Sequence, residues 1–277
     1  MKADCHIHMV LDGVDWRSAI ARHENAPCEA FIRDALRRYQ ELGYAYLRDC
    51  GDRWGVGARA KAVAAEYGID YRTPLAPLCK AGHYGAFIGN VYENMKQYAQ
   101  LVVNTRQQGG DFIKIMISGL MDFNCCGRLT EPGLEKGQIR ELIHIAHEEG
   151  MAVSAHANGA DTILAAAEAG VDSVEHGAYQ NGESLAAMAQ AGTVWVPTLS
   201  TVGNLLGKDR FDRYAVEQIL NSALENLSRY EGLVAPGTDA GAWAVPHGSE
   251  TEAQLLAMAG IREDRLAEGV ATIRKKF

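Results

Sequence analysis

Apolar and polar positions follow two periods along most of the chain. Short apolar runs predict strands at 4–8, 44–50, 69–75, 112–118, 152–156, 172–176, 194–198 and 233–239. Apolar residues three and four positions apart predict helices at 28–42, 57–67, 90–108, 135–149, 159–169, 184–191, 209–230, 250–258 and 262–275. Most of these helices end at a glycine, which suits a left-handed cap. Residues 11–26 have no period and are expected to form a long loop.

Eight strands, each followed by a helix, predict an α/β fold: a (β/α)8 TIM-type barrel with eight parallel strands. A doubly wound sheet is the weaker alternative, because no strand leads into a Gly-rich phosphate turn. Barrels of about 250 residues form one domain. No linker or low-complexity segment interrupts the 277 residues, so we expect a single barrel domain over 1–277.

The charge and cysteine content exclude several classes of partner and site. The chain has 27 Lys and Arg against 35 Asp and Glu, a net charge of −8, without a basic block, so neither nucleic acid nor an anionic membrane is an expected partner. No signal-peptide pattern or long apolar run is seen, and a cytoplasmic location is expected. The six cysteines form no Cys-x-x-Cys pair, which favours free thiols.

The first predicted strand carries two histidines, in the sequence Asp4-Cys5-His6-Ile7-His8. Alternation along a strand would put Asp4, His6 and His8 on one face and Cys5 and Ile7 on the other. Two imidazoles on one strand face converge on one point, which is a metal-ligand geometry. A solvated pair on an edge strand is the alternative.

Other polar residues occupy the carboxyl ends of the predicted strands, where barrel enzymes carry their chemistry. Together with the two histidines they are His6, His8, Lys114, His156, His176 and Asp239. In the strand 112–118 three isoleucines share one face, so Lys114 should point into the barrel. Either it pairs with an inward acid such as Asp4, or the neutral amine adds carbon dioxide and becomes a carbamate that can bridge two cations.

The order of these motifs resembles the amidohydrolase superfamily of metal-dependent hydrolases. The closest branch is that of the imidazolonepropionase-like and Xaa-Pro dipeptidase-like members. The matching motifs are Asp4-x-His6-x-His8, Phe112-Ile113-Lys114-Ile115-Met116, Ser154-Ala155-His156, Val174-Glu175-His176-Gly177 and Gly237-Thr238-Asp239-Ala240-Gly241. Shorter similarities are Arg48-Asp49-Cys50-Gly51, Ala81-Gly82-His83 and His247-Gly248.

The resemblance implies a binuclear metal centre. His6, His8 and Asp239 would bind the more buried ion, His156 and His176 the more exposed one, and carboxylated Lys114 would bridge both. The expected cofactors are two divalent metal ions, zinc first, with carbon dioxide to carboxylate Lys114. The expected partner is a small-molecule substrate, and members of the superfamily are commonly homo-oligomers.

The resemblance also implies a reaction. It is hydrolysis of an amide-type C–N bond (peptide-like, N-acyl or lactam) by a metal-bridging hydroxide. Asp239 would act as general base and then general acid, although a purely structural role as a ligand stays open. A lactonase or esterase, a deaminase, and a non-catalytic metal-binding barrel are the alternatives. Deaminases of the superfamily lack the lysine on the fourth strand, so Lys114 argues against them.

Two departures from the family pattern stand out. Members of this branch usually carry a β-rich domain beside the barrel, and none is expected here, so the chain is either a barrel-only member or a fragment of a longer gene product. Dipeptidase-like members often have an aromatic residue after the histidine of the fifth strand, whereas this chain has Ala157-Asn158. This difference argues against recognition of a peptide carboxylate.

Polar residues in the loops after the strands are candidates for binding the substrate. They are His83, Tyr84, Arg128, Tyr179, Trp243 and His247. Arg128 could grip a substrate carboxylate or pair with Glu131. For all six, packing in the loops at the surface is an equal alternative.

Overall fold

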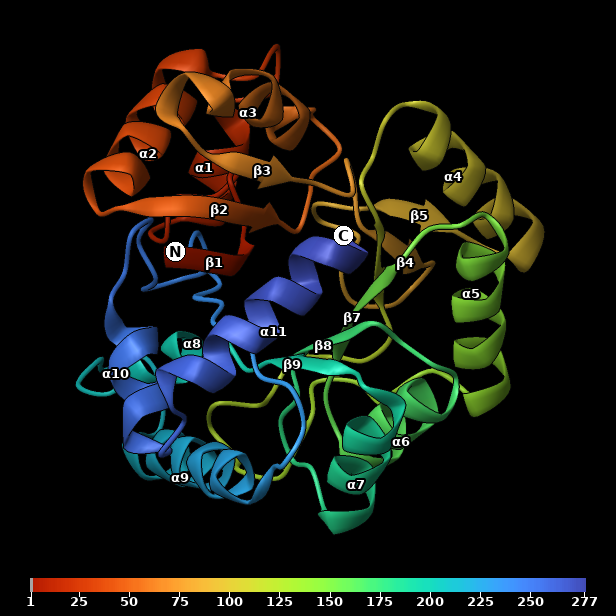
Figure 1. The fold of residues 1–277 in the computed structure, drawn as a ribbon, viewed down its shortest axis with the longest axis vertical. Helices are drawn as coiled ribbons and strands as arrows, with labels where there is room; N and C mark the ends of the chain where they lie inside the picture. The colour runs from red at the N-terminus through yellow and green to blue at the C-terminus, as the bar shows by residue number, and fades with distance from the viewer. Residues whose placement is uncertain (1) are drawn as a thin grey trace.

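The computed structural model of the protein describes residues 2–277 as an alternation of strands and helices (Figure 1). The strands are β1 (Lys2–Ile7), β2 (Tyr44–Asp49), β3 (Asp70–Arg72), β4 (Leu78–Lys80), β5 (Asn90–Tyr92), β6 (Ile113–Met116), β7 (Val153–Ala157), β8 (Ser173–His176) and β9 (Val194–Val196). The helices are α1 (Trp16–Ala21), α2 (Glu29–Glu41), α3 (Val56–Ala64), α4 (Met95–Gln107), α5 (Lys136–Glu148), α6 (Ala160–Glu168), α7 (Gly182–Ala191), α8 (Ser200–Gly203), α9 (Arg213–Arg229), α10 (Thr251–Met258) and α11 (Glu263–Lys276).

All strand pairs are parallel, and they form two sheets. The first has the order β1-β2-β3 and the second the order β5-β4-β6-β7-β8-β9. The prediction of an α/β fold with parallel strands is therefore confirmed. Residues 233–239, predicted as the eighth strand, form no regular strand: Val234 makes an isolated bridge to Trp195 of β9, and Ala240, just after the segment, makes one to Ile7 of β1. Their backbone hydrogen bonds reach both strands, from Trp195 N to Leu233 O (2.8 Å) and from Asp239 N to His6 O (2.8 Å).

Several element boundaries differ from the prediction for local reasons. The predicted strand 69–75 ends at Arg72 and the chain resumes as β4, because Pro74 and Pro77 interrupt the backbone donors. Asn90–Tyr92 is a strand, and α4 begins only after Asn94, whose side chain accepts a hydrogen bond from Gln97 N. The expected loop 11–26 contains α1.

Helices cover the outer face of the strands and bury its apolar side chains. The β6 isoleucines Ile113 and Ile115 pack in one cluster with Leu142 and Ile143 of α5. Lys114 lies on the opposite face of β6, as predicted. None of the helices in residues 2–277 combines the length and apolar character that a membrane span requires.

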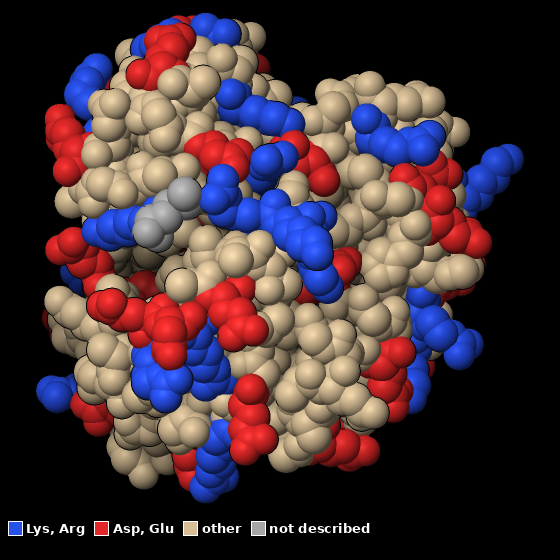
Figure 2. All heavy atoms as spheres, viewed as in Figure 1, with Lys and Arg blue, Asp and Glu red and all other residues tan. Residues whose placement is uncertain are grey.

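The last helix, α11, lies across the middle of the molecule, between the two sheets (Figure 1). Its basic last turn reaches both sheets, because Arg274 pairs with Asp70 of β3 (3.2 Å) and Lys276 with Asp172, just before β8 (3.0 Å). Basic side chains gather over this end of α11, with acidic ones around them (Figure 2). The short basic run at the end of the chain therefore has a structural role in fixing α11.

Candidate metal centre

A register shift in β1 decides which side chains face the interior. Asp4 pairs with Leu47 and Ile7 pairs with Asp49, so β1 uses one residue more than β2 between these pairs. Paired residues of parallel strands point to the same face, which puts Asp4 with Ile7 on the outer face. The prediction that Asp4 shares a face with His6 and His8 is therefore wrong. The Asp4 carboxylate instead accepts hydrogen bonds from Thr238 N (2.9 Å) and Thr238 Oγ1 (2.6 Å).

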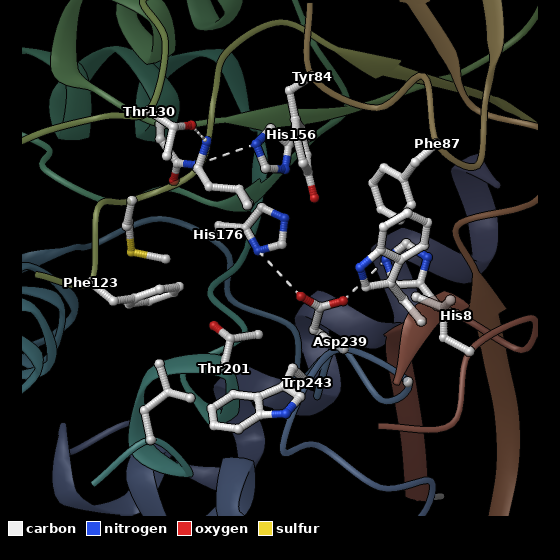
Figure 3. Close-up of a pocket in the computed structure, with 18 of the residues that line it drawn as sticks. His8, Tyr84, Phe87, Phe123, Thr130, His156, His176, Thr201, Asp239 and Trp243 are labelled. Carbon is white, nitrogen blue, oxygen red and sulfur yellow. Dashed lines mark hydrogen bonds and ion pairs between the residues drawn. The ribbon is translucent and has the colours of Figure 1, made fainter. Parts of the chain in front are cut away.

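The six side chains predicted to bind metal line one cavity of about 620 Å³. They come from β1, β6, β7, β8 and the segment after residue 233, and they are His6, His8, Lys114, His156, His176 and Asp239. The Asp239 carboxylate lies between His8 and His176, and His156 lies beyond His176 (Figure 3). Residues up to 233 positions apart in sequence thus meet at one end of the strands.

The distances within this group are short. Asp239 Oδ1 lies 3.1 Å from His8 Nε2 and 3.4 Å from His6 Nε2, and Asp239 Oδ2 lies 4.0 Å from His176 Nδ1 (Figure 3). The rings of His156 and His176 have centroids 4.5 Å apart, and those of His6 and His176 are 5.0 Å apart. One carboxylate therefore lies within 4.0 Å of three histidines, two from the end of β1 and one from the end of β8.

Several polar atoms in this group are buried without a hydrogen-bond partner. They are His8 Nδ1 and Lys114 Nζ, together with His6 Nε2 and Asp239 Oδ1, whose contacts at 3.1–3.4 Å with each other and with His8 Nε2 are ion-pair contacts only. Lys114 is 1% exposed and, within residues 2–277, makes neither a hydrogen bond nor an ion pair, so the alternative that it pairs with Asp4 is not realised. Unpaired buried polar atoms are costly, and their convergence indicates a ligand.

The electrostatics favour neutral imidazoles at His8, His156 and His176 beside an anionic carboxylate, whereas His6 differs. Burial lowers the pKa of His156 to about 3, with Lys114 nearby, and burial also lowers the pKa of His8 and His176. The pKa of His6 is raised, because Cys50 and Asp239 outweigh the effect of burial. Burial raises the pKa of Asp239, but the neighbouring His6 and His8 hold it well below its usual value.

Glu175 contacts His6 at the ring nitrogen that faces away from the cavity. Its Oε2 lies 2.7 Å from His6 Nδ1, and its Oε1 accepts from Arg48, Ser154 and Ser173 at 2.6–2.8 Å. Glu175 and Arg48 are fully buried, and Arg48 helps to hold the pKa of this carboxyl well below its usual range despite burial. The arrangement fixes the His6 ring and leaves Nε2 facing the cavity, as an outer carboxylate does for metal-binding histidines.

The backbone is strained where these strands end. His176 (φ 66°), Thr198 (φ 49°) and Asp239 (φ 58°) all lie in the left-handed region. Thr198 Oγ1 also lies 2.7 Å from His176 Nδ1. Such conformations cost about 1–3 kcal/mol each and cluster at functional sites.

These residues fit a divalent metal ion. The ligand atoms of His6, His176 and Asp239 lie within 4.8 Å of one another, and so do those of His6, His8 and Cys50. Imidazole nitrogens with carboxylate oxygens are a donor set that zinc accepts. The unpartnered buried atoms support the same interpretation, since coordination would satisfy them.

Of the six predicted substrate-binding residues, the structure brings two to the cavity. Tyr84 and Trp243 line it. Arg128 is 71% exposed and lies near Asp122 (3.8 Å), and Glu131 instead accepts a hydrogen bond from Tyr84 N.

The other three candidates also lie outside the cavity lining. His83 is partly exposed, and Tyr179 packs against the outer apolar cluster. His247 is buried and has structural partners, Leu11 O (2.9 Å) and Tyr39 Oη (3.1 Å). The structure therefore does not bring Arg128, His83, Tyr179 and His247 to the cavity, and their contact with a substrate stays a prediction.

Sequence reasoning missed most of the cavity lining. Aromatic and basic side chains from three separate loops and α1 also line the cavity: Trp16, Arg17, Phe87, Phe123, Arg210 and Phe211. The Arg210 guanidinium lies 4.5 Å from the Trp243 ring centroid, and the Trp16 and Phe87 rings are 5.5 Å apart. Their sequence gives no period that would have pointed to them. The cavity is therefore polar at the histidines and largely apolar elsewhere.

Comparison with known proteins gives distant relatives. No family model matches the chain. An uncharacterized protein from Mycobacterium tuberculosis is 25% identical over 98% of this chain and 67% of its own length. Ochratoxinase from Aspergillus niger is 25% identical over 84% of this chain and 55% of its own length, and imidazolonepropionase from Acidiphilium cryptum is 29% identical over 70% and 53%. The chain thus spans little more than half of the two relatives that carry a functional name.

Solved structures share the fold. A Xaa-Pro dipeptidase with bound methionine superposes with a TM-score of 0.77 at 20% identity, covering 99% of this chain and 75% of the other. Ochratoxinase from Aspergillus niger superposes with a TM-score of 0.76 at 20% identity, covering 99% and 69%.

Proposed function

We propose that the chain is a member of the amidohydrolase superfamily and that it is a binuclear metal-dependent hydrolase of amide-type C–N bonds. One observation carries the proposal: six side chains from five separate segments line one cavity, and three of them have buried nitrogen atoms without a hydrogen bond. The similarity to a dipeptidase, an imidazolonepropionase and an ochratoxinase supports the same class of reaction.

We further propose that the two parallel sheets are parts of one eight-stranded barrel. The segment 233–240 hydrogen-bonds to both β9 and β1, which supports closure on that side. On the other side, β3 pairs with β2 and β4 pairs with β6. In the proposed barrel, β3 and β4 are therefore the first and second halves of one interrupted strand. In a barrel, the metal-facing residues occupy the carboxyl ends of the strands.

His6, His8 and Asp239 would hold one ion, His156 and His176 would hold the other, and Lys114, as a carbamate, would bridge them. When bound, divalent ions such as zinc lower the pKa of water toward about 7 and polarise a carbonyl oxygen. Coordination would also satisfy the buried nitrogens that lack partners here.

Residues of the chain perform the proton transfers and orient the reactants. Asp239 accepts the proton of the attacking water at a carboxylate oxygen and donates it to the leaving nitrogen, as general base and then general acid. Glu175 keeps the His6 ring in place through Nδ1. The apolar lining, including Trp243 and Phe87, receives the organic part of a small-molecule substrate and excludes water.

Metal analysis and substrate trials test the proposal together. The protein is purified with zinc and bicarbonate, its metal content is measured, and hydrolysis of dipeptides, N-acyl amino acids, lactams and lactones is followed before and after chelation. We expect about two ions per chain and chelator-sensitive hydrolysis of an amide-type substrate. Absence of tightly bound divalent ions would overturn the proposal, and turnover of lactones alone would reassign the reaction to ester hydrolysis.

A further inference from the structure

Cys50, the first residue after β2, lies beside the two histidines of β1. Its sulfur and one ring nitrogen from each of His6 and His8 lie within 4.8 Å of one another, and all three residues are buried. Cys50 is only 1% exposed. The motif similarity and the ligand set proposed above give this thiol no role.

The backbone dictates this position. Tyr46, Arg48 and Cys50 share one face of β2 by strand alternation, and Arg48 reaches inward to Glu175 (2.7 Å). Cys50 N donates to Ile7 O (2.8 Å), the residue between the two histidines. The thiol is therefore directed at the imidazoles by the pairing of β1 with β2.

The residues on either side of Cys50 hold the backbone in place at this position. The Asp49 carboxylate accepts from Met9 N (3.1 Å) and Thr73 Oγ1 (3.1 Å), which ties it to the segments after β1 and β3. Gly51 has φ 83°, and a Cβ atom there would meet Leu75 O at 2.8 Å. Such a fixed geometry is what a metal ligand requires.

The neighbouring donors lack partners. His6 Nε2 and His8 Nδ1 are both buried without a hydrogen bond, although the His6 ring is held at Nδ1 by Glu175. Two imidazoles beside a thiol form a mixed nitrogen and sulfur donor set. Such a set binds zinc well, whereas magnesium and manganese prefer oxygen ligands.

We propose that Cys50 is a thiolate ligand of the ion held by His6 and His8. The inference rests on the proposed function, which supplies the metal ion. When the metal–sulfur bond forms, the thiol proton is released to solvent, and no oxidation or reduction occurs. The centre would then hold one sulfur-ligated ion and one ion ligated only by nitrogen and oxygen, and the first would favour zinc or cobalt.

X-ray absorption at the zinc edge tests this on the natural chain. We expect a sulfur scatterer at about 2.3 Å from zinc in addition to nitrogen and oxygen neighbours. A spectrum of a two-zinc protein without sulfur would overturn the role of Cys50 and leave the proposed hydrolase intact. Failure of the protein to bind zinc at all would overturn both.

Cobalt substitution gives a second readout with a matched control. We expect the natural chain and Cys79→Ser to show thiolate-to-cobalt charge-transfer absorption, and Cys50→Ser and Cys50→Ala to lack it. Cys79 is equally buried but belongs to β4, outside the cluster. Zinc affinity should fall at least about 10-fold in Cys50→Ser and stay unchanged in Cys79→Ser, because loss of a ligand costs no less than loss of an outer partner. Absorption that persists in the Cys50 variants would overturn the proposal.

Discussion

His6 Nδ1 and Glu175 Oε2 lie 2.7 Å apart in the fully buried interior, 169 residues apart in sequence. Glu175 also neutralises Arg48 (2.7 Å), so one carboxylate both orients a metal-facing histidine and balances a buried cation. The proposed metal centre and the stability of the interior therefore depend on the same side chain.

Glu175→Gln should weaken both functions. The amide cannot balance Arg48, and a buried charge left without its partner costs about 3–5 kcal/mol of unfolding free energy. Metal affinity should fall about 10–100-fold, because the His6 ring loses its orienting anion. Urea unfolding and metal titration measure the two effects. Glu268→Gln, at an exposed position of α11, is the control. Unchanged metal affinity in Glu175→Gln would contradict a positioning role.

Asp239→Asn should keep bound metal and lose turnover. The amide cannot accept a proton from water, and loss of general base and acid catalysis costs about 10²–10⁴-fold in kcat. Metal content and kcat are measured on the same preparation, with Asp209→Asn, an exposed position, as the control. Near-normal kcat would remove Asp239 from the proton transfers.

Lys114→Met should abolish the binuclear centre yet stabilise the metal-free chain. Within residues 2–277 the Lys114 Nζ atom is buried without a hydrogen bond or ion pair, so an apolar side chain of similar length should raise the free energy of unfolding by about 1–3 kcal/mol. Metal stoichiometry should drop at the same time. The control is Lys96→Met, at an exposed position of α4. A variant that still binds two ions would show that Lys114 does not bridge them.

Glu252→Gln should change how stability depends on pH. Burial raises the pKa of the Glu252 carboxyl from 4.5 to about 8, although Ser200 N and Ser200 Oγ donate to it. Between these values the folded chain holds a proton that the unfolded chain has lost. This group therefore makes stability fall as pH rises through the window, by up to about 1.4 kcal/mol per pH unit.

The glutamine variant should lose this contribution and be the more stable form at about pH 8. Urea unfolding of both proteins at several pH values from about 5 to about 8 measures the difference. Glu268→Gln should keep the natural slope. Parallel stability profiles for Glu252→Gln and the natural chain would contradict the assignment.

Trp243→Ala should affect substrate binding more than the chemical step. The Trp243 ring lines the cavity and lies under the Arg210 guanidinium. Its loss should raise KM about 10-fold for substrates with a large apolar group, and leave kcat nearly unchanged. Tyr214→Ala, at an exposed position of α9, is the control. A selective loss of kcat would instead assign Trp243 to the transition state.

The convergence of the six proposed metal ligands on one cavity could be predicted from sequence, because the repeat of strand and helix brings strand ends together. Knowing that Lys114, His156 and His176 end parallel strands suffices to expect that they meet. The isoleucines of β6 fixed the inward direction of Lys114 in the same way. Similarity in motif order added the expected role of each residue.

The remaining features depend on geometry that no local pattern encodes. The extra residue of β1 moves Asp4 to the outer face, and alternation alone cannot reveal it. The sequence also does not show which face of its strand Cys50 or Glu175 occupies, and so it does not show that either side chain points at His6. The position of a residue after a strand does not show where its loop runs. For this reason the sequence predicts substrate binding for His247 and Arg128, which lie outside the cavity, and not for Trp16 and Phe87, which line it.

The origin of the cavity lining has a consequence for how the protein could change its substrate. Its floor is made of residues at strand ends, tied into the sheets by pairing, whereas its walls come from α1 and from loops such as those that carry Phe87, Phe123 and Phe211. Loops vary without disturbing the strands beneath them. Selection or engineering can therefore redirect the protein to new substrates by exchanging walls, while the reaction carried out on the floor stays the same.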